Sequence, residues 1–340
     1  MNSLNFAILD YVALPRFVLR PDPEGRPVYA FWNRAAERLG VDYEAIRAVN
    51  SRIIHASSSG FRLDGERRDW LAFDDVIQGA SGVAGIMARA SGEPRYFPTV
   101  IADKLCGYIL ASSIAMAFVW RERTGHGQQV NVPMMDAMVN FNLIEHLWGA
   151  TLDRPDLGMG YSRVFSPHRR PYPTQDGHIC VMAAMDNQWL RLFDAIGRPE
   201  LRDDPRFATA ELRTDHIDGL YGILAEAIAG NTTAEWRRRF DAADVPNGPA
   251  NSLEDLLVDP YLVQTGYFER HEHPTEGALV TPRIPVQFSD SPGRVRRLPP
   301  RLGEHTEEVL AKVMELREKW GLNRPRIADR PTAGQLRMAL

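Results

Sequence analysis

The longest uninterrupted hydrophobic pattern in the chain is a run of sixteen residues without a charge, residues 105–120. It is followed by RERTG at residues 121–125, which places basic residues and then a glycine where helices commonly end. A transmembrane helix needs roughly 18 to 25 apolar residues. The pattern therefore predicts a helix that is enclosed by protein on most of its sides, and not a membrane span.

Shorter patterns on both sides of this helix predict strands and further helices. Residues 128–132 (QQVNV) alternate between polar and apolar side chains as a strand does. Pro133 stands at the start of a helical pattern that reaches residue 148, a position that proline favours. Residues 52–57 are typical of a short strand, and residues 75–90 of a helix. Strands that alternate with helices in this way indicate an α/β fold.

The second half of the chain has shorter elements separated by linkers. Residues 151–172 are rich in Gly, Pro, Arg and Ser, as linkers are. Beyond them the patterns predict a strand at 178–182, helices at 186–196, 212–229 and 233–243, an interrupted strand within 277–291 and an amphipathic helix at 302–320. We therefore predict a large domain that is split in sequence, formed by residues 1–165 and 281–340, around a smaller α+β domain at residues 173–280.

Composition is that of an ordinary globular protein and argues against several classes of function. Of 340 residues, 44% are hydrophobic and 25% charged, and the net charge of −4 gives no general attraction for nucleic acid. Cys106 and Cys180 are too few for a disulfide framework, and the first twenty residues do not resemble a secretory signal. We therefore expect a reducing, cytoplasmic location. His271 and His273 lack a convincingly spaced carboxylate or cysteine partner, so we expect no metal site.

Asp103 lies at the start of the charge-free helix, where a carboxylate has two possible roles. As an N-cap, it would accept hydrogen bonds from the first unpaired backbone N–H groups. As a nucleophile, it would be kept ionised by the positive end of the helix dipole and could attack a thioester. The residues around Asp103 leave both roles open.

Five motifs follow one another in an order that resembles one enzyme family. They are SGF at residues 59–61, DVIQGASG at 75–82, IADKLCG at 101–107, RERTGHGQ at 121–128 and LGEHTEEVL at 302–310. From about Arg38 to Leu310 the chain resembles the class III CoA-transferases, the superfamily of formyl-CoA transferase, carnitine CoA-transferase and 2-methylacyl-CoA racemase.

The resemblance implies a fold, a reaction and a set of site residues. The fold would be a Rossmann-like, CoA-binding large domain split around the smaller α+β domain, in a homodimer whose two subunits interlock. Asp103 matches the catalytic aspartate, which in the family becomes acylated and then carries CoA as a thioester. The matching positions for substrate and CoA binding are Arg38 near the CoA phosphates, Phe73 and Asp74 at the thioester end of the pocket, and Lys104 beside the catalytic aspartate. Coenzyme A would be a substrate, exchanged between an acyl-CoA and a carboxylic acid, with no permanently bound cofactor.

Three departures from the family pattern keep other functions open. Racemases of this family carry a His where this chain has Phe73, which makes a 2-methylacyl-CoA racemase the weaker alternative. Residues 183–187 (AAMDN) replace the glycine-rich loop of formyl-CoA transferase, which argues against formyl or oxalyl substrates. The opening strands of the family are not visible before Arg38, and residues 17–19 and 27–30 predict two short strands around a turn instead. A non-catalytic paralogue with a degraded CoA site is the third interpretation.

Overall fold

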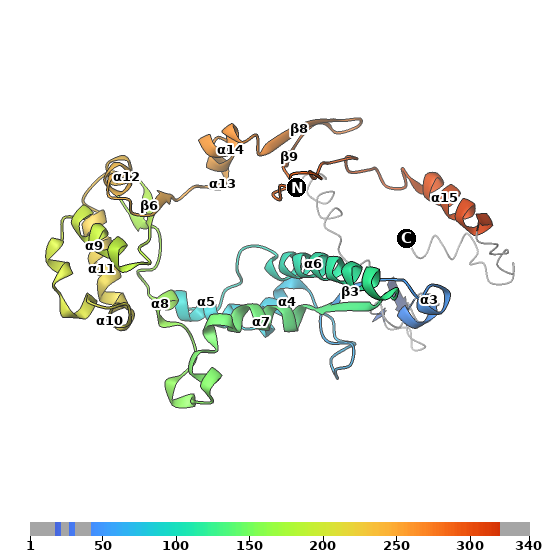
Figure 1. Cartoon of the computed structure of the whole chain (residues 1–340), viewed down its shortest axis with the longest axis horizontal. Helices are drawn as coiled ribbons and strands as arrows, with labels where there is room; N and C mark the ends of the chain where they lie inside the picture. Colours follow the sequence, from blue (N-terminus) through green and yellow to red (C-terminus); the bar gives the residue numbers. More distant parts are fainter. Residues whose placement is uncertain (1–17, 22–26, 31–41, 320–340) are drawn as a thin grey trace. The chain divides into compact units, whose positions relative to one another are not determined.

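The computed structural model describes residues 18–21, 27–30 and 42–319 of the chain. These residues belong to two compact units (Figure 1), one within residues 33–250 and the other combining residues 1–32 with 251–340. The division predicted above, with boundaries at residues 165, 173 and 281, stays a prediction.

The first half of the unit within residues 33–250 is built around two parallel strands. Its elements are α3 (Tyr43–Val49), β3 (His55–Ser59), α4 (Asp74–Ala80), α5 (Val83–Ser91), α6 (Ile101–Thr124), β4 (Gln129–Pro133) and α7 (Met134–His146). β3 pairs with β4 in register from His55 opposite Gln129 to Ser59 opposite Pro133. α6 contacts both strands as well as α4 and α7, and Figure 1 shows it running along the strands. Parallel strands need such a crossover helix, so this half has the α/β arrangement that the sequence pattern indicates.

Two glycines set the ends of helices in this half. Gly82 has a φ of 98°, a left-handed conformation that interrupts a helix, and the single helix predicted at 75–90 is therefore two helices, α4 and α5. Gly125 has a φ of 78° and caps α6, as the sequence predicts. The strand predicted at 52–57 begins later, at His55.

The prediction that α6 is enclosed by protein on most sides is wrong for the single chain. Three of its side chains are buried, those of Ala102, Cys106 and Ala117, whereas Tyr108 is 73% and Met116 is 70% exposed. The reason is that the two-stranded sheet and its neighbours cover one side of the helix. Among the described residues, α6 is the one helix long and apolar enough to cross a membrane by length and composition alone.

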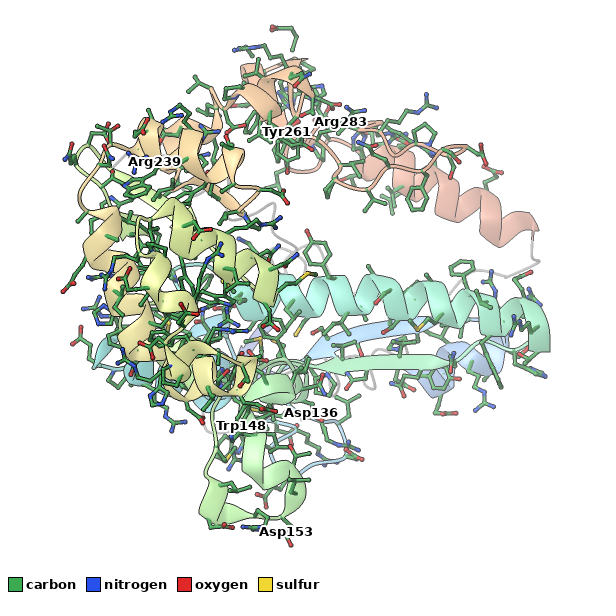
Figure 2. All side chains as sticks on the ribbon, turned by 60° about the vertical axis from the view of Figure 1, so that its left-hand side comes forward. Asp136, Trp148, Asp153, Arg239, Tyr261 and Arg283 are labelled. Atoms are coloured by element: carbon green, nitrogen blue, oxygen red, sulfur yellow. The ribbon has the colours of Figure 1, made fainter. Side chains whose placement is uncertain are left out.

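The second half of this unit has its own core. Its strands β5 (Tyr172–Pro173), β6 (His178–Val181) and β7 (Asn247–Pro249) form an antiparallel sheet in that order. Its helices are α8 (Ser162–Phe165), α9 (Asp186–Ala195), α10 (Ala210–Asp215), α11 (Ile217–Ile228) and α12 (Thr233–Ala242), with 3-10 helices at Trp148–Leu152, Pro155–Leu157, Pro199–Arg202 and Pro205–Phe207. Trp148 and Asp153, both with positive φ, flank the first turn after α7 (Figure 2). Phe193, Leu224 and Phe240, each at most 1% exposed, lie in the core between these helices.

The other unit consists of two hairpins and three helices among its described residues. β1 (Val18–Pro21) pairs antiparallel with β2 (Pro27–Ala30), which confirms the two short strands predicted there. α13 (Leu253–Leu256) and α14 (Pro260–Gln264) precede a hairpin of β8 (Phe268–His273) and β9 (Gly277–Pro282), and α15 (Thr306–Lys319) follows. β9 ends at Pro282, one of the prolines expected to interrupt this strand because proline cannot donate a ladder hydrogen bond.

Candidate active site

Asp103 does not cap α6. The helix begins at Ile101 and its N-cap residue is Val100, whose side chain makes no capping hydrogen bond. Asp103 is therefore the third helical residue, three positions further into the helix than the N-cap position that the sequence pattern suggests. In the described part of the chain its carboxylate has no hydrogen-bond or ion-pair partner. Of the two roles left open by the sequence, the N-cap is wrong.

Asp74 provides the cap from another helix. It is the first residue of α4 and is only 6% exposed. Its Oδ1 accepts hydrogen bonds from the backbone N–H groups of Ala102, at 2.7 Å, and Asp103, at 3.1 Å. A carboxylate at this point satisfies donors that a helix leaves unpaired and also interacts favourably with the helix dipole.

Gln78 fixes Asp74 and the loop before α6 at the same time. It lies one turn after Asp74 on α4 and is 1% exposed. Its Nε2 donates to Asp74 Oδ2 and to the carbonyl oxygen of Thr99 at 3.1 Å, and its Oε1 accepts from the N–H of Phe97 at 2.9 Å. Gln78 lies in the DVIQGASG motif, from which no role for it was predicted. The i, i+4 spacing of Asp74 and Gln78 on one helix face is the signal that could have found the pair.

A small hydrophobic core packs beneath the hydrogen bonds that join Asp74, Gln78 and the start of α6. Phe61, Ile77, Val83, Ala102 and Met138 pack together and are each at most 8% exposed. Ala102 lies directly before Asp103, and Ile77 lies directly before Gln78, so both helix starts are anchored in the same core. Close packing of this kind fixes where the polar side chains above it lie.

Burial and a like charge act on Asp103. Its half-buried position raises the pKa of its carboxyl above the usual range, and the negative charge of Asp74 raises that pKa further. Desolvation disfavours the charged form of a carboxyl, and a neighbouring carboxylate does the same. At a pH above this raised pKa, the ionised carboxylate is more basic and therefore a better nucleophile than that of an ordinary aspartate.

The other predicted site residues have different surroundings. Lys104 is exposed, and its Nζ donates to Thr99 Oγ1 at 2.6 Å, which directs the ammonium group toward the loop before α6. Phe73 directly precedes Asp74 and is 49% exposed. Arg38 lies outside the described residues. The structure thus brings together Asp103, Asp74 and Lys104, with Phe73 adjacent to Asp74 in the chain.

The backbone donors at the start of α6 are not available to a substrate. The N–H groups of Ala102 and Asp103 bond to Asp74, and that of Ile101 bonds to the carbonyl oxygen of Thr99 at 2.8 Å. Oxyanion stabilisation needs free donors aimed at the developing charge. Donors for an oxyanion that forms beside Asp103 would have to come from other residues.

A groove of about 400 Å³ lies at the opposite end of α6. It is lined by Ile54 and Ala56 next to and on β3, and by Ile114, Phe118 and Arg121 on α6. Phe118 is about 22 Å along the helix from Asp103 at 1.5 Å per residue. The groove is therefore separate from the candidate active site.

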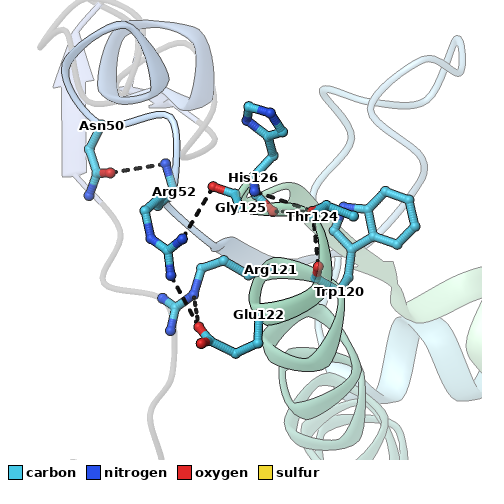
Figure 3. A network of polar contacts seen from close by, with 8 residues as sticks. All are labelled: Asn50, Arg52, Trp120, Arg121, Glu122, Thr124, Gly125 and His126. Carbon is cyan, nitrogen blue, oxygen red and sulfur yellow. Dashed lines mark hydrogen bonds and ion pairs between the residues drawn. The ribbon is translucent and has the colours of Figure 1, made fainter.

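The charged groups beside this groove are already paired with one another (Figure 3). The Arg52 guanidinium donates to Glu122 Oε1 at 3.2 Å and to the carbonyl oxygen of Gly125 at 3.4 Å, and Arg121 donates to the same Glu122 oxygen at 3.2 Å. This network joins the residues before β3 to the last turn of α6.

Metal binding finds no support in the part of the chain that the structure describes. No group of three His, Cys, Asp or Glu side chains there is arranged to hold an ion. The His271 ring contacts Thr281 Oγ1 at 3.1 Å, and the His273 ring contacts the carbonyl oxygen of Pro299 at 2.7 Å. Both histidines bond to neighbouring chain segments instead of converging on one point.

The two cysteines should differ sharply in reactivity. Cys106 lies one turn after Asp103, is 2% exposed, and has a pKa raised to about 11 by burial and by the charges of Asp103 and Asp74. At pH 8 about one thiol in a thousand would then be the reactive thiolate. We expect iodoacetamide at this pH to alkylate the exposed Cys180 in the native protein and to leave Cys106 unmodified. Peptide mapping by mass spectrometry measures both sites, with urea-unfolded protein as the control in which both react. Equal native rates would contradict the burial of Cys106.

Comparison with known proteins gives a consistent family. A model of CoA-transferase family III matches residues 28–306. The succinate–glutarate CoA-transferase of Agrobacterium fabrum is 30% identical over 286 residues, which cover 81% of this chain and 69% of that protein. A formyl-CoA:oxalate CoA-transferase of Rhodopseudomonas palustris is 28% identical over 375 residues, which cover 96% and 87%. The chain spans 61% of a further relative, an acyl-CoA transferase of Fusarium pseudograminearum.

Solved structures agree on the fold. A CaiB/BaiF family protein from Brucella suis superposes with a TM-score of 0.63 at 25% identity, over 82% of this chain and 73% of that one. Rv3272 from M. tuberculosis superposes with a TM-score of 0.66 at 24% identity, over 80% and 73%. These matches confirm the resemblance found in the sequence motifs: the chain belongs to the family III CoA-transferases and is an enzyme of this class.

Proposed function

We propose that the protein moves CoA from an acyl-CoA donor to a carboxylic acid acceptor, with Asp103 as the nucleophile. The observation that carries this proposal is the unpartnered, half-buried carboxylate in the first turn of α6, whose pKa is raised by burial and by Asp74. A carboxylate that merely capped the helix would accept its N–H bonds, and Asp74 already does so.

The reaction proceeds in four transfers at one carboxylate. An Asp103 oxygen attacks the carbonyl carbon of the donor thioester, and the C–S bond breaks. This step forms a mixed anhydride between Asp103 and the donor acyl group and releases CoA as its thiolate. The thiolate then attacks the aspartyl carbonyl and expels the donor acid as its carboxylate, which leaves an aspartyl-CoA thioester. The acceptor carboxylate attacks this thioester and forms a second anhydride and free thiolate. Attack of the thiolate on the acceptor acyl carbon releases the new acyl-CoA and restores the Asp103 carboxylate.

The relatives and the segment at residues 183–187 indicate which donor and acceptor acids to test first. Two relatives are named for succinate with glutarate and for formyl-CoA with oxalate. In this chain the N–H groups of Ala184 and Met185 bond to Gln188 Oε1, at 2.9 and 3.1 Å, and are not free to bind a small substrate as an open glycine loop would be. We therefore propose dicarboxylic acids such as succinate and glutarate as the first substrates to test.

A panel assay tests the proposed function. The protein is incubated with succinyl-, glutaryl-, formyl- and oxalyl-CoA against the free acids, and new acyl-CoA is measured by mass spectrometry. We expect transfer with at least one pair. Titration with free CoA serves as the control, because a non-catalytic paralogue with a degraded CoA site would neither bind CoA nor transfer it.

Deuterium incorporation at the α-carbon should be negligible. Racemisation needs an acid and a base on opposite sides of that carbon, and Phe73, at the position of the racemase His, cannot move a proton. The measurement is wash-in from heavy water into a 2-methylacyl-CoA, followed by mass spectrometry. Rapid incorporation without CoA transfer would support the racemase and contradict the transferase as the main activity.

We further propose that the functional form is an interlocked, cytoplasmic homodimer, without nucleic-acid or membrane partners and without a permanently bound cofactor. Two features of the single chain indicate a surface that a second subunit would cover. Val119 and Trp120 on α6 are 53% and 52% exposed, in addition to Tyr108 and Met116. Among the described residues β3 pairs with β4 alone, so its other edge is open, and open edges in native proteins are normally covered or blunted.

Sedimentation at decreasing protein concentration, without detergent, measures the assembly. We expect a dimer that persists on dilution and then loses structure slowly, because interlocked subunits cannot separate while they are folded. A compact folded monomer of 38.3 kDa in rapid equilibrium with dimer would contradict interlocking. Protein that stays dispersed only in detergent would instead assign the exposed face of α6 to a lipid environment.

A further inference from the structure

We propose that Asp74, held by Gln78, is a positioning residue of the reaction: it caps α6 in place of Asp103 and so keeps the Asp103 carboxylate uncapped beside a like charge. This inference rests on the proposed role of Asp103 as the nucleophile and deepens it.

The hydrogen bonds at the start of α6 are complete without the Asp103 side chain. The N–H of Ile101 donates to Thr99 O at 2.8 Å, and the N–H groups of Ala102 and Asp103 donate to Asp74 Oδ1. The first intrahelical bond runs from the N–H of Lys104 to Val100 O at 3.2 Å. A helix start needs partners for its first N–H groups, and an aspartate in the first turn is a common source of them. Because Asp74 supplies that partner, the Asp103 oxygens are not held by the backbone.

Asp74 itself is fixed by neutral donors. Besides the two backbone N–H groups, it accepts a hydrogen bond from the Gln78 amide, and no cation among the described residues is paired with it. Buried carboxylates are stabilised by hydrogen bonds of this kind when they lack an ion pair. The charge of Asp74 acts on both Asp103 and Cys106.

Other charged groups on elements packed against α6 are directed elsewhere. On α7, Asp136 contacts Arg62 at 3.9 Å and Glu145 contacts His146 at 3.7 Å. On α4, Asp75 is exposed to solvent. On α6 itself the Lys104 ammonium donates to Thr99 Oγ1. Of these groups, Asp74 is the one whose charge contributes to the titration of Asp103.

The arrangement favours the chemical step because acylation removes the charge of Asp103. Before reaction two carboxylates lie close together in a partly desolvated site, which destabilises the ionised nucleophile. Once Asp103 becomes an anhydride or a thioester it is neutral, and the repulsion by Asp74 disappears. Interactions that are more favourable in the transition state than in the ground state accelerate a reaction.

Asp74→Asn separates the charge from the cap. The amide oxygen of Asn can still accept from the N–H groups of Ala102 and Asp103, so α6 stays capped while the negative charge is lost. The hydrogen bond from Gln78 Nε2 is lost as well, because the Asn amide nitrogen replaces the oxygen that accepts it. Asp75→Asn makes the same change of charge one residue away, on an exposed side chain, and is the matched control. Thermal denaturation of both variants checks that they fold as the wild type does.

The first readout is a titration that needs no activity. Carbon-13 NMR of protein labelled at the aspartate carboxyls follows the Asp103 signal, which is assigned by its loss in Asp103→Asn. We expect the midpoint of the Asp103 carboxyl titration to move to lower pH in Asp74→Asn and to stay unchanged in Asp75→Asn. An unchanged midpoint in Asp74→Asn would overturn the proposal, whatever transfer activity is found.

The second readout is the pH dependence of acylation in a single turnover, measured as CoA thiolate released on mixing with acyl-CoA. We expect the rising limb of the pH–rate profile to move to lower pH in Asp74→Asn. The plateau rate should fall about tenfold, because the repulsion that acylation relieves is lost with the charge. If Asp74 only supports the fold, Asp74→Asn would lower the plateau rate without shifting the rising limb of the pH–rate profile. That result would overturn the proposal. If the NMR midpoint moves but no acyl-CoA acylates the wild type, the coupling of Asp74 to Asp103 holds and the proposed function fails.

Discussion

Replacing Asp103 by Asn or Ala should abolish CoA transfer, by at least about 10⁴-fold, and leave the fold intact. The loss is large because the covalent route through the aspartyl anhydride disappears with the carboxylate, and no parallel route uses the remaining groups. The fold should persist because α6 is capped by Asp74 and the Asp103 carboxylate has no partner among the described residues. Transfer is measured by mass spectrometry of the acyl-CoA products, and folding by thermal denaturation.

Trapping identifies the residue that reacts. Wild-type protein incubated with acyl-CoA and hydroxylamine should carry the modification on Asp103, and neither Asp103→Asn nor Asp103→Ala should carry it. Asp75→Asn is the matched control and should transfer CoA at the wild-type rate, because Asp75 is exposed and lies outside the network. Modification of a different residue under turnover would show that the nucleophile is assigned wrongly.

The pH dependence of the wild-type reaction follows from the same carboxyl. Burial and the Asp74 charge raise the pKa of Asp103, so its ionised and reactive form is populated only at higher pH than for an ordinary aspartate. Transfer should therefore increase as pH rises through this raised pKa. The sign for stability is the opposite. A carboxyl with a raised pKa favours the folded state when it is protonated, and this contribution is lost as pH rises.

Gly127→Ala should destabilise the protein by at least about 3 kcal/mol, or prevent it from folding. A Cβ at this position would lie 1.8 Å from the carbonyl oxygen of Ile53 and 2.4 Å from its carbonyl carbon. These are backbone atoms and cannot rotate away. Gly127 also donates its N–H to Ser51 O at 2.9 Å, at the point where the chain from α6 joins β4 beside β3. The substitution would separate the two strands that α6 packs on.

Gly79→Ala is the control for this prediction. Gly79 lies in α4, and a Cβ there would meet no atom within 4 Å. Replacing a helical glycine by alanine in open space should stabilise the protein by about 0.5 to 1 kcal/mol. Urea denaturation of the two variants at equal protein concentration compares them. If Gly127→Ala unfolded at the same urea concentration as the wild type, this would contradict the close approach of Gly127 and Ile53.

Several elements could be predicted because their causes lie within a few residues of one another. α6 extends to Thr124 and is closed by Gly125, as the charge-free run and the glycine after it predict. Pro133 directly precedes α7, and β4 covers most of the alternating stretch predicted as a strand. The break between α4 and α5 could not be read from apolar spacing, because it depends on the conformation of Gly82. A glycine permits a left-handed φ but does not require it.

In the candidate site too, local sequence patterns could not decide an interaction between distant residues. The resemblance to the family predicted Asp103 as the nucleophile, whereas the local pattern alone was also typical of an N-cap. The structure decides the cap: Asp74, which lies 28 residues before Ala102 in the sequence, accepts a hydrogen bond from the Ala102 N–H. Such a pairing depends on how α4 packs against α6, through Ile77 and Ala102 in one small core, and no window of neighbouring residues contains that information.

By itself the sequence determined the family, the α/β pattern and the C-terminal end of α6, and its motifs predicted Asp103 as the nucleophile. Each of these depends on residue types and on spacings of a few residues, which govern backbone hydrogen bonds and the direction of side chains. Only the tertiary structure decided which carboxylate caps α6 and that Gln78 holds it. It also showed that one face of α6 is exposed and that β3 pairs with β4 alone among the described residues. Burial and the partners of a charge are properties of segments brought together by packing, so they exist only once the chain has folded.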